Sequence, residues 1–163
     1  MNSLWRPAYV AIGSNLDSPR DRVVEAFERM RDLRATRPVL RSRLYLTNPM
    51  GPQDQPQFVN AAAGLLTLLA PRDLLTELLD IERSMGRVRQ ERWGPRVIDL
   101  DLLWMVDSPI TMPGLQLPHP GVSTRNFVLY PLADIAPTLE IPGLGQVLDL
   151  KSRAGAEGIS VLQ

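Results

Sequence analysis

The chain has 163 residues, of which 44% are hydrophobic and 22% are charged, with 18 basic and 18 acidic side chains. This size and composition predict one globular domain over residues 1–163 that can bury a core without staples. The balanced charge gives no electrostatic reason for a nucleic-acid or anionic-membrane partner, and the absence of cysteine excludes disulfides, thiolate metal sites and a cysteine nucleophile.

No segment is expected to enter a membrane. Met1–Pro7 lacks the apolar stretch of a secretory signal, and the longest apolar run, Ala61–Ala70, has about half the length that a membrane helix needs. These features predict a cytoplasmic protein. Lys151 is the only lysine, and the other basic residues are arginines, which suit bidentate contacts with phosphate. Because this bias runs through the chain, only the position of an arginine can argue for a site.

The first part of the chain is predicted to form a strand, a helix and a second strand. The short apolar run Ala8–Ile12 is typical of a buried strand. A helix is expected over residues 18–33, with Ser18 as its N-cap and Pro19 at the first helical position. Alternating residue types over 39–47 indicate a half-exposed strand.

The next part is predicted to form a strand, a helix and a strand. Residues 58–69 are apolar and carry too little charge for a surface helix, so they indicate a strand. Pro71 is expected to open a second helix, and Gly86 is its expected C-terminal stop. The apolar segment 97–106 predicts another strand.

The order of elements to residue 106 is therefore β-α-β-β-α-β. This is the ferredoxin-like arrangement of two crossovers on an antiparallel sheet, so the expected class is α+β, with helices packed on the sheet. The C-terminal additions comprise a short apolar helix over 127–135, despite Pro131, and a polar tail over 151–163 that is expected to be poorly ordered. The fold alone does not give the function.

Two aspartates mark the last strand of this core. Asp99 and Asp101 are two residues apart, so both carboxylates project from one face, roughly 6–7 Å apart. Carboxylates on a rigid strand suit magnesium, which takes one or two protein oxygens, and two ions could clamp a transferring phosphoryl group. The alternative is a polar strand face in water, but aspartate is disfavoured in strands. The other face is expected to reach a core through Ile98, Leu100, Leu102 and Trp104.

Arginines crowd the loop before this strand. They are Arg87, Arg89, Arg92 and Arg96, with Trp93 among them. Such arginines can neutralise the charge of a triphosphate as it moves in the transition state, and Trp93 could cover a planar substrate. A solvated basic loop anchored by a buried tryptophan is about as good an interpretation, given the arginine bias of the chain.

Other candidates lie farther apart in the sequence. His119 is the only histidine; it could donate to phosphate or act as a general acid, although a packed or exposed loop histidine is the simpler alternative. Phe58 and Asn60 share a strand face and could stack on and hydrogen-bond to a flat heterocycle, or serve as core and strand-end cap. Neither a GxxxxGK[ST] loop nor a GxGxxG fingerprint is present.

Taken together, these blocks resemble the 6-hydroxymethyl-7,8-dihydropterin pyrophosphokinase family of folate biosynthesis, from Ala8 to about Pro142. The blocks occur in one order, which makes them more specific than any single motif. They are AIGSNL at 11–16, GPQDQP at 51–56, GRVR at 86–89, RWGPRVIDLD at 92–101, and Pro118–His119 followed by Arg125 and FVL at 127–129.

The resemblance implies a reaction in which the pyrophosphoryl group of ATP passes to the hydroxymethyl oxygen of the pterin and AMP leaves. It implies a monomer that holds two Mg²⁺ ions on Asp99 and Asp101. Arg87 and Arg89 would be loop arginines that close on the phosphates. Further nucleotide or phosphate contacts are implied for Glu82, Arg96, His119 and Arg125. Pterin contacts are implied for Thr47, Phe58, Asn60, Trp93 and Phe127.

The sequence departs from the family pattern at several positions. Leu79 stands where some members carry a polar residue near the adenine, and the arginine loop is one residue shorter. Phe58 and Pro120 each replace a tyrosine, and Asn48 replaces a proline. These differences concern the adenine contacts and the loop, not the metal pair.

Two other functions are open from the residues alone. One is a ferredoxin-like binding module that holds a nucleotide or pterin without chemistry; the aspartate pair and the arginine loop argue against it. The other is an RNA-binding ferredoxin-like domain, which the neutral charge and the absence of the expected surface aromatics argue against.

Overall fold

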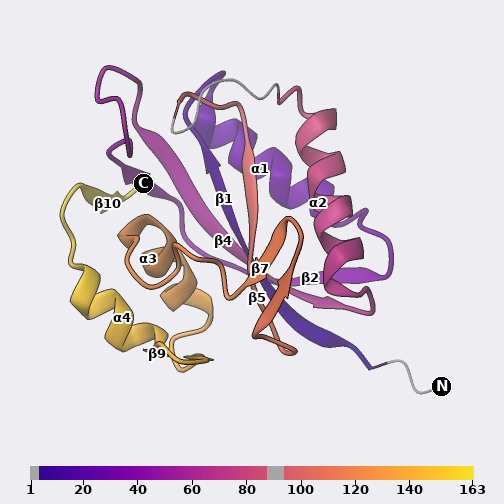
Figure 1. Ribbon diagram of the computed structural model, residues 1–163. Coiled ribbons are helices and arrows are strands. Elements are labelled where there is room, and N and C mark those ends of the chain that lie inside the picture. Colours follow the sequence, from indigo (N-terminus) through magenta and orange to yellow (C-terminus); the bar gives the residue numbers. More distant parts are fainter. Residues whose placement is uncertain (1–3, 88–93) are drawn as a thin grey trace.

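A computed structural model describes residues 4–87 and 94–163 (Figure 1). Over these residues, the main sheet has six strands in the order β10-β3-β4-β1-β5, and β2 also pairs with β4. All of these pairings are antiparallel. The strands are β1 (Arg6–Ser14), β2 (Thr36–Arg41), β3 (Tyr45–Thr47), β4 (Phe58–Thr67), β5 (Asp99–Met105) and β10 (Ile159–Val161).

Helices cover both faces of this sheet. Side chains of α1 (Pro19–Met30) and α2 (Pro71–Ser84) form one core with the sheet, and those of α3 (Asn126–Ile135) and α4 (Val147–Ala154) form a second core. In Figure 1, α3 and α4 lie together, well apart from α2. Two small hairpins complete the described structure: β6 (Ile110–Met112) with β7 (Leu115–Leu117), and β8 (Glu140–Ile141) with β9 (Gly145–Gln146).

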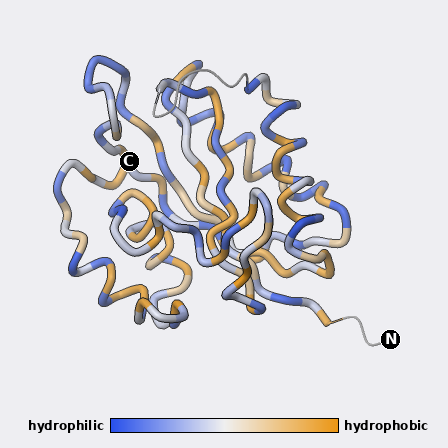
Figure 2. The backbone as a smooth tube through the Cα atoms, in the orientation of Figure 1, coloured by the Kyte–Doolittle hydropathy of each residue, from blue (hydrophilic) through white to orange (hydrophobic). Residues whose placement is uncertain are grey.

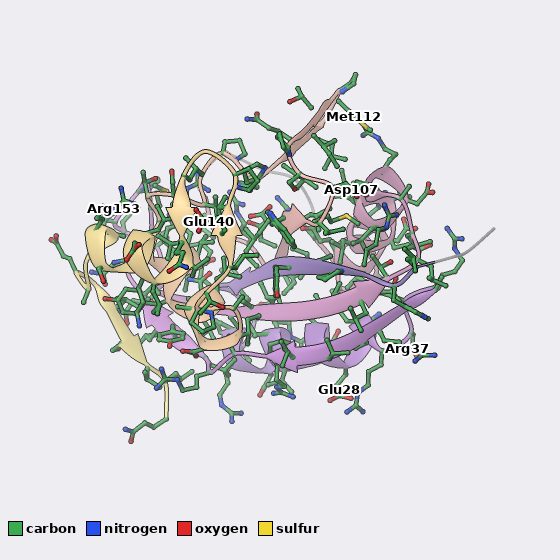
Figure 3. All side chains as sticks on the ribbon, turned by 90° about the horizontal axis from the view of Figure 1, so that it is seen from below. Glu28, Arg37, Asp107, Met112, Glu140 and Arg153 are labelled. Atoms are coloured by element: carbon green, nitrogen blue, oxygen red, sulfur yellow. The ribbon has the colours of Figure 1, made fainter. Side chains whose placement is uncertain are left out.

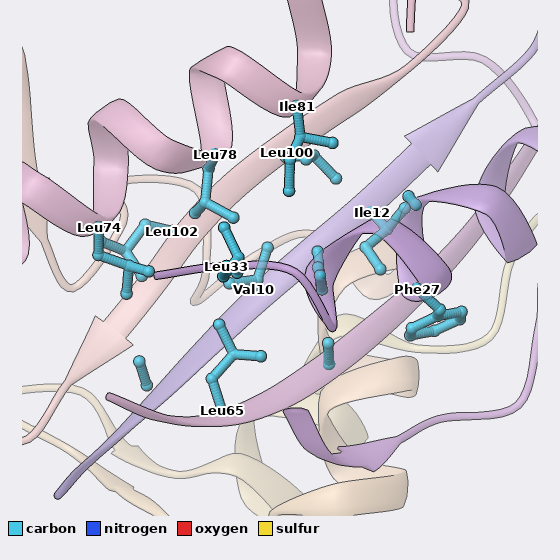
Figure 4. Packing of buried hydrophobic residues seen from close by; sticks show 14 of the residues in the cluster. Val10, Ile12, Phe27, Leu33, Leu65, Leu74, Leu78, Ile81, Leu100 and Leu102 are labelled. Carbon is cyan, nitrogen blue, oxygen red and sulfur yellow. The ribbon is translucent and has the colours of Figure 1, made fainter. Parts of the chain in front are cut away.

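The larger core follows from the sequence pattern. Figure 4 shows Leu74, Leu78 and Ile81 of α2 close to Leu100 and Leu102 of β5. All five side chains are buried, which confirms the apolar stripe of the helix and the alternation in the first part of the strand. Figure 2 shows the hydrophobic residues concentrated in the central strands and helices, whereas many of the connecting turns are hydrophilic.

The predicted β-α-β-β-α-β order is confirmed, but the predicted strand over 39–47 is two strands, β2 and β3. The register of β2 against β4 shifts between Pro38 and Leu40, so Val39 is an extra residue on β2. Farther on, the Ser42 hydroxyl accepts the Ala62 N–H at 2.8 Å and so replaces a backbone carbonyl.

A β-bulge changes the direction of the residues at the end of β5. Tyr9 pairs with Trp104 but Val10 pairs with Leu102, so Leu103 is an extra residue on β5. Leu103 and Trp104 therefore both belong to the core under α3, and the prediction that Trp104 shares the face of Leu102 was wrong. The rings of Tyr9 and Trp104 lie 5.8 Å apart between centroids.

Helix ends match the sequence only in part. Pro19 occupies the first helical turn, but Ser18 adopts a left-handed conformation and makes no side-chain cap bond, so its predicted capping role was wrong. Gly86 follows α2 with φ of 90°, as expected for a C-terminal stop. Within residues 4–87 and 94–163, every helix is too short or too polar to cross a bilayer.

The tail over 151–163 was expected to be poorly ordered, and this was wrong. Its first residues complete α4, and residues 159–161 form β10, which adds to the free edge of β3. The tail is polar, and poor order was inferred from that composition alone. The partners that hold it, β3 and Asn126, lie far away in the sequence.

Candidate active site

The described candidate residues meet in one cavity of about 840 Å³. This cavity extends from α2 and the β6–β7 hairpin, past the edge strand β5, to the sheet face that carries α3. Its lining includes Thr47, Phe58, Asn60, Glu82, Arg87, Arg96, Asp99, Asp101, His119, Arg125 and Phe127. The other candidates, Arg89 and Trp93, lie outside the described residues, as does Arg92.

Two small residues of β1, Ala11 and Gly13, form the floor of the cavity between the aspartates of β5 and Asn60 of β4. Ala11 pairs with Asp101, and Gly13 pairs with Asp99 on one side and with Asn60 on the other. A Cβ atom at Gly13 would lie 2.8 Å from the Asn60 Oδ1 atom, so only glycine leaves this amide in place. Neither residue was assigned a role from the sequence, although small residues inside a strand signal a close approach.

The carboxylate end of the site holds a network of ion pairs. Arg87 Nη1 donates to Glu82 Oε2 at 2.7 Å and to Asp99 Oδ1 at 2.8 Å. Arg96 Nη1 donates to Asp99 Oδ2 at 2.8 Å. Glu82 Oε2 also accepts the Leu100 N–H at 2.7 Å, which ties the end of α2 to β5. Both carboxylate oxygens of Asp99 are therefore held by guanidinium groups.

The surroundings of Asp101 disfavour the ionised form of its carboxyl group. Burial, together with the nearby charges of Asp99 and Glu82, raises the pKa of Asp101 from 3.8 to about 7, against the opposing effect of Arg96 and Arg125. Burial likewise raises the pKa of Glu82. A bound cation would offset this effect, since it favours the ionised form of both carboxyl groups.

His119 is oriented by its own loop. Its backbone N–H donates to the Leu103 carbonyl at 2.8 Å, and its Nδ1 atom accepts the Gly121 N–H at 3.1 Å. Burial, together with the nearby Arg125 charge, lowers the pKa of His119. With Nδ1 as acceptor, the neutral ring carries its proton on Nε2. This arrangement favours a neutral hydrogen-bond donor over a general acid.

The opposite end of the cavity is aromatic and amide-lined. Asn60 Nδ2 donates to Thr47 Oγ1 at 2.7 Å, and both side chains are buried. Phe58 lies opposite Thr47 in the β3–β4 ladder, and Phe127 stands in the first turn of α3. The Arg125 guanidinium lies 6.0 Å from the centroid of the Phe127 ring. Two partly exposed aromatic rings and a fixed amide suit a flat, polar heterocycle.

Asn15 joins the two loops that border the cavity, one before β4 and one before β5. It was assigned no role from the sequence. Its Oδ1 atom accepts the Arg96 N–H at 2.8 Å, and its own N–H donates to the Arg96 carbonyl at 3.0 Å. Its Nδ2 atom donates to Gln55 Oε1 at 3.0 Å and to the Pro56 carbonyl at 2.9 Å. The side chain is buried, so these bonds are not shared with bulk water. The only sequence signal was a polar residue directly after a buried strand.

The β6–β7 hairpin forms the wall next to α2. It projects from the body of the molecule near the labelled Met112 (Figure 3) and contributes that residue to the cavity. Arg72 of α2 donates to the carbonyl of Pro113 and so ties the hairpin to the helix. Leu79 and Pro120, two of the departures from the expected pattern, both line the cavity.

A family model described as 7,8-dihydro-6-hydroxymethylpterin-pyrophosphokinase (HPPK) matches residues 9–137. The chain belongs to the HPPK family. The resemblance inferred from the spaced sequence blocks is thus confirmed.

Curated relatives of this family match almost the whole chain. The chain is 47% identical over 154 residues to the 2-amino-4-hydroxy-6-hydroxymethyldihydropteridine pyrophosphokinase of Pseudomonas aeruginosa, covering 94% of this chain and 95% of that one. It is 42% identical over 143 residues to the Haemophilus influenzae protein of the same name, covering 88% and 89% of the two chains.

Solved structures support the HPPK fold. The wild-type Plasmodium falciparum HPPK-DHPS protein with pteroate matches with a TM-score of 0.73 and 14% identity, over 94% of this chain and 43% of that one. The chain thus spans less than half the length of that protein. At this identity the likeness concerns the fold, and it agrees with the α+β class expected from the sequence.

Proposed function

We propose that this chain transfers the pyrophosphoryl group of ATP to the hydroxymethyl group of 6-hydroxymethyl-7,8-dihydropterin, releases AMP, and uses Asp99 and Asp101 to hold two Mg²⁺ ions. Family membership supports the reaction. The observation that supports the residue roles is the single cavity in which a carboxylate pair, arginines and two aromatic rings face one another.

The donor set fits magnesium. Asp99 and Asp101 both line the cavity, and their carboxylate oxygens would make up part of a coordination shell. Mg²⁺ is bound in this way when water and substrate phosphates complete its shell. Burial and the neighbouring carboxylates raise the pKa of Asp101 to about 7, and a bound cation would favour its ionised form. When bound, the ions would neutralise phosphate charge and align the attacking and leaving oxygens.

The cationic residues then define the phosphate end of the cavity. Arg87 and Arg96 reach the carboxylates from opposite sides, at 2.8 Å from the two Asp99 oxygens. Arg125 and the neutral His119 face the same space from the α3 side. We assign these four side chains, with Glu82 as the anchor of Arg87, to ATP and phosphate contacts. Arg89 is proposed as a second loop arginine that acts with Arg87.

The pterin is proposed to lie between Phe58 and Phe127. Asn60 and Thr47 would meet its edge, since their hydrogen bond fixes the amide orientation at the rim of the cavity. Trp93 is proposed to close over the same end. This placement points the hydroxymethyl group at the carboxylates across the Ala11–Gly13 floor.

Catalysis in this arrangement is mainly positioning and charge stabilisation. The aromatic pair and the amide hold the acceptor, and the arginines hold the phosphates, so the reacting oxygen and phosphorus are brought together without a covalent intermediate. We also propose that the protein is a monomer located in the cytoplasm.

A coupled assay for AMP tests the proposed function. Magnesium-dependent AMP release is expected when both ATP and the pterin are present, and ADP as the product would instead indicate transfer of one phosphoryl group. Asp101→Ala is expected to abolish turnover, and a near-normal rate would refute the metal assignment. Tight binding of substrates without AMP formation would favour a binding module.

A further inference from the structure

The C-terminal segment 155–162, here called the strap, reaches back from α4 to the edge of β3 (Figure 1). It lies beyond the part of the chain that the family model matches, which ends at residue 137. Its residues do not line the cavity. The strap nevertheless bonds to both walls between which the pterin is proposed to bind.

The strap holds the first wall through β3 and Asn48. Ile159 pairs with Thr47, and the Gly158 carbonyl accepts the Asn48 N–H at 3.0 Å. The Asn48 Oδ1 atom in turn accepts Gln57 Nε2 at 3.1 Å, directly before Phe58. Gly158 has φ of 71°, and a Cβ atom there would lie 2.7 Å from Asn48 Nδ2. The contact at this point therefore depends on glycine.

The strap holds the second wall through Asn126, the residue before Phe127. Asn126 Nδ2 donates to the Gly155 carbonyl at 3.1 Å and to the Glu157 carbonyl at 2.8 Å. These bonds fix the first turn of α3, where Phe127 stands. The far end of α3 has its own tie to β3, since the Tyr45 hydroxyl donates to Asp134 Oδ1 at 2.8 Å. The two ends of α3 are thus fixed to the sheet independently.

We propose that the strap is a positioning element for the pterin: it sets the separation of Phe127 from the Thr47–Phe58 wall. This inference rests on the proposed function, because it takes the aromatic pair as the pterin site. The carboxylates and arginines are on β5, α2 and the loop before β5, and the strap makes none of the hydrogen bonds found among them. Loosening the strap should therefore weaken pterin binding and leave ATP binding nearly unchanged.

Matched glycine variants separate this role from a loss of stability. Gly158→Ala forces a side chain into a left-handed conformation and displaces Asn48. Gly143→Ala imposes the same backbone strain, with φ of 76°, in the β8–β9 turn, where a Cβ atom meets nothing within 4 Å. A third variant, Asn126→Asp, keeps the side-chain size but removes the donor to the two strap carbonyls. Steady-state kinetics and thermal unfolding are measured for all three and for the wild type.

Gly158→Ala and Asn126→Asp are expected to raise KM for the pterin by about fivefold or more while KM for ATP stays within about twofold. Gly143→Ala should leave both constants unchanged despite a similar fall in Tm. If Gly158→Ala does not fold, the KM values of Asn126→Asp alone test the inference. Unchanged pterin KM in the folded strap variants, or an equal rise in both KM values, would overturn the inference. If the wild type forms no AMP, the proposed function fails instead.

Discussion

Replacing Asp101 by asparagine is expected to stabilise the magnesium-free protein while it abolishes turnover. Asparagine keeps the size and polarity of the side chain but removes the charge that burial, Asp99 and Glu82 disfavour. Because the pKa of Asp101 is higher in the folded state, the protonated carboxyl group is more compatible with the folded protein than the ionised one. Asp101 therefore stabilises the fold only at low pH. That contribution is present below pH 3.8 and is lost as the pH rises toward about 7.

The magnitude follows from the pKa. A rise from 3.8 to about 7 means that full ionisation costs at most about 4 kcal/mol of unfolding free energy, at about 1.4 kcal/mol per pKa unit. The linkage relation puts about 2 to 3 kcal/mol of this cost between about pH 5 and about pH 8. For a chain of this size, that amounts to roughly 5–10 °C in Tm.

Thermal unfolding in a chelator, at several pH values, measures the effect. The Tm advantage of Asp101→Asn over the wild type should be small near the acidic end and grow steadily to about pH 8. Adding Mg²⁺ with an ATP analogue should stabilise the wild type more than the variant, because a cation relieves the same repulsion. A Tm difference that stays constant across this pH range would refute the view that Asp101 is electrostatically strained.

Three further substitutions test other parts of the site. Gly13→Ala should push the Asn60 amide aside, because a Cβ atom would lie 2.8 Å from Oδ1, and should raise KM for the pterin; an unchanged KM contradicts the placement of that amide. Asn15→Ala should lower kcat/KM by about tenfold, since it removes the hydrogen bonds to both loops that border the cavity. Unchanged kinetics would show that the loops keep their positions without Asn15. Tyr45→Phe removes a hydrogen bond to Asp134 and should lower the unfolding free energy by about 1 kcal/mol in urea titrations, with both KM values unaltered; a selective rise in pterin KM would contradict this.

The order of the core elements could be predicted because each has a strong local pattern. The helical spacing of apolar residues in α2 and the continuous apolar run of β4 are both local features, and both elements were placed correctly. The bulge at Leu103 could not be predicted, because it depends on how β5 pairs with β1 rather than on its own sequence. The order of the tail was missed for the same reason, since β10 exists only as a partner of β3.

The described site residues were named from spaced motifs, and the structure brings them into one cavity. What the sequence could not supply was the set of residues that hold them. Asn15 acts through hydrogen bonds to loops about 40 and 80 residues away, and no local pattern encodes those contacts. Gly121 is a second case: its N–H donates to His119 Nδ1, and a Cβ atom there would lie 2.4 Å from the Arg125 Cζ atom, the end of a flexible side chain that would have to move.

The two guanidinium groups on Asp99 have a consequence for the order in which ligands can bind. A divalent cation that approaches Asp99 must compete with Arg87 and Arg96 for the same oxygens. If the proposed roles hold, a polyphosphate would draw those arginines away from Asp99. A cation bound to Asp99 would in turn free the arginines for the anion. Such coupling is reciprocal. Free cation alone should therefore bind weakly, and cation and nucleotide should enter as cooperative partners.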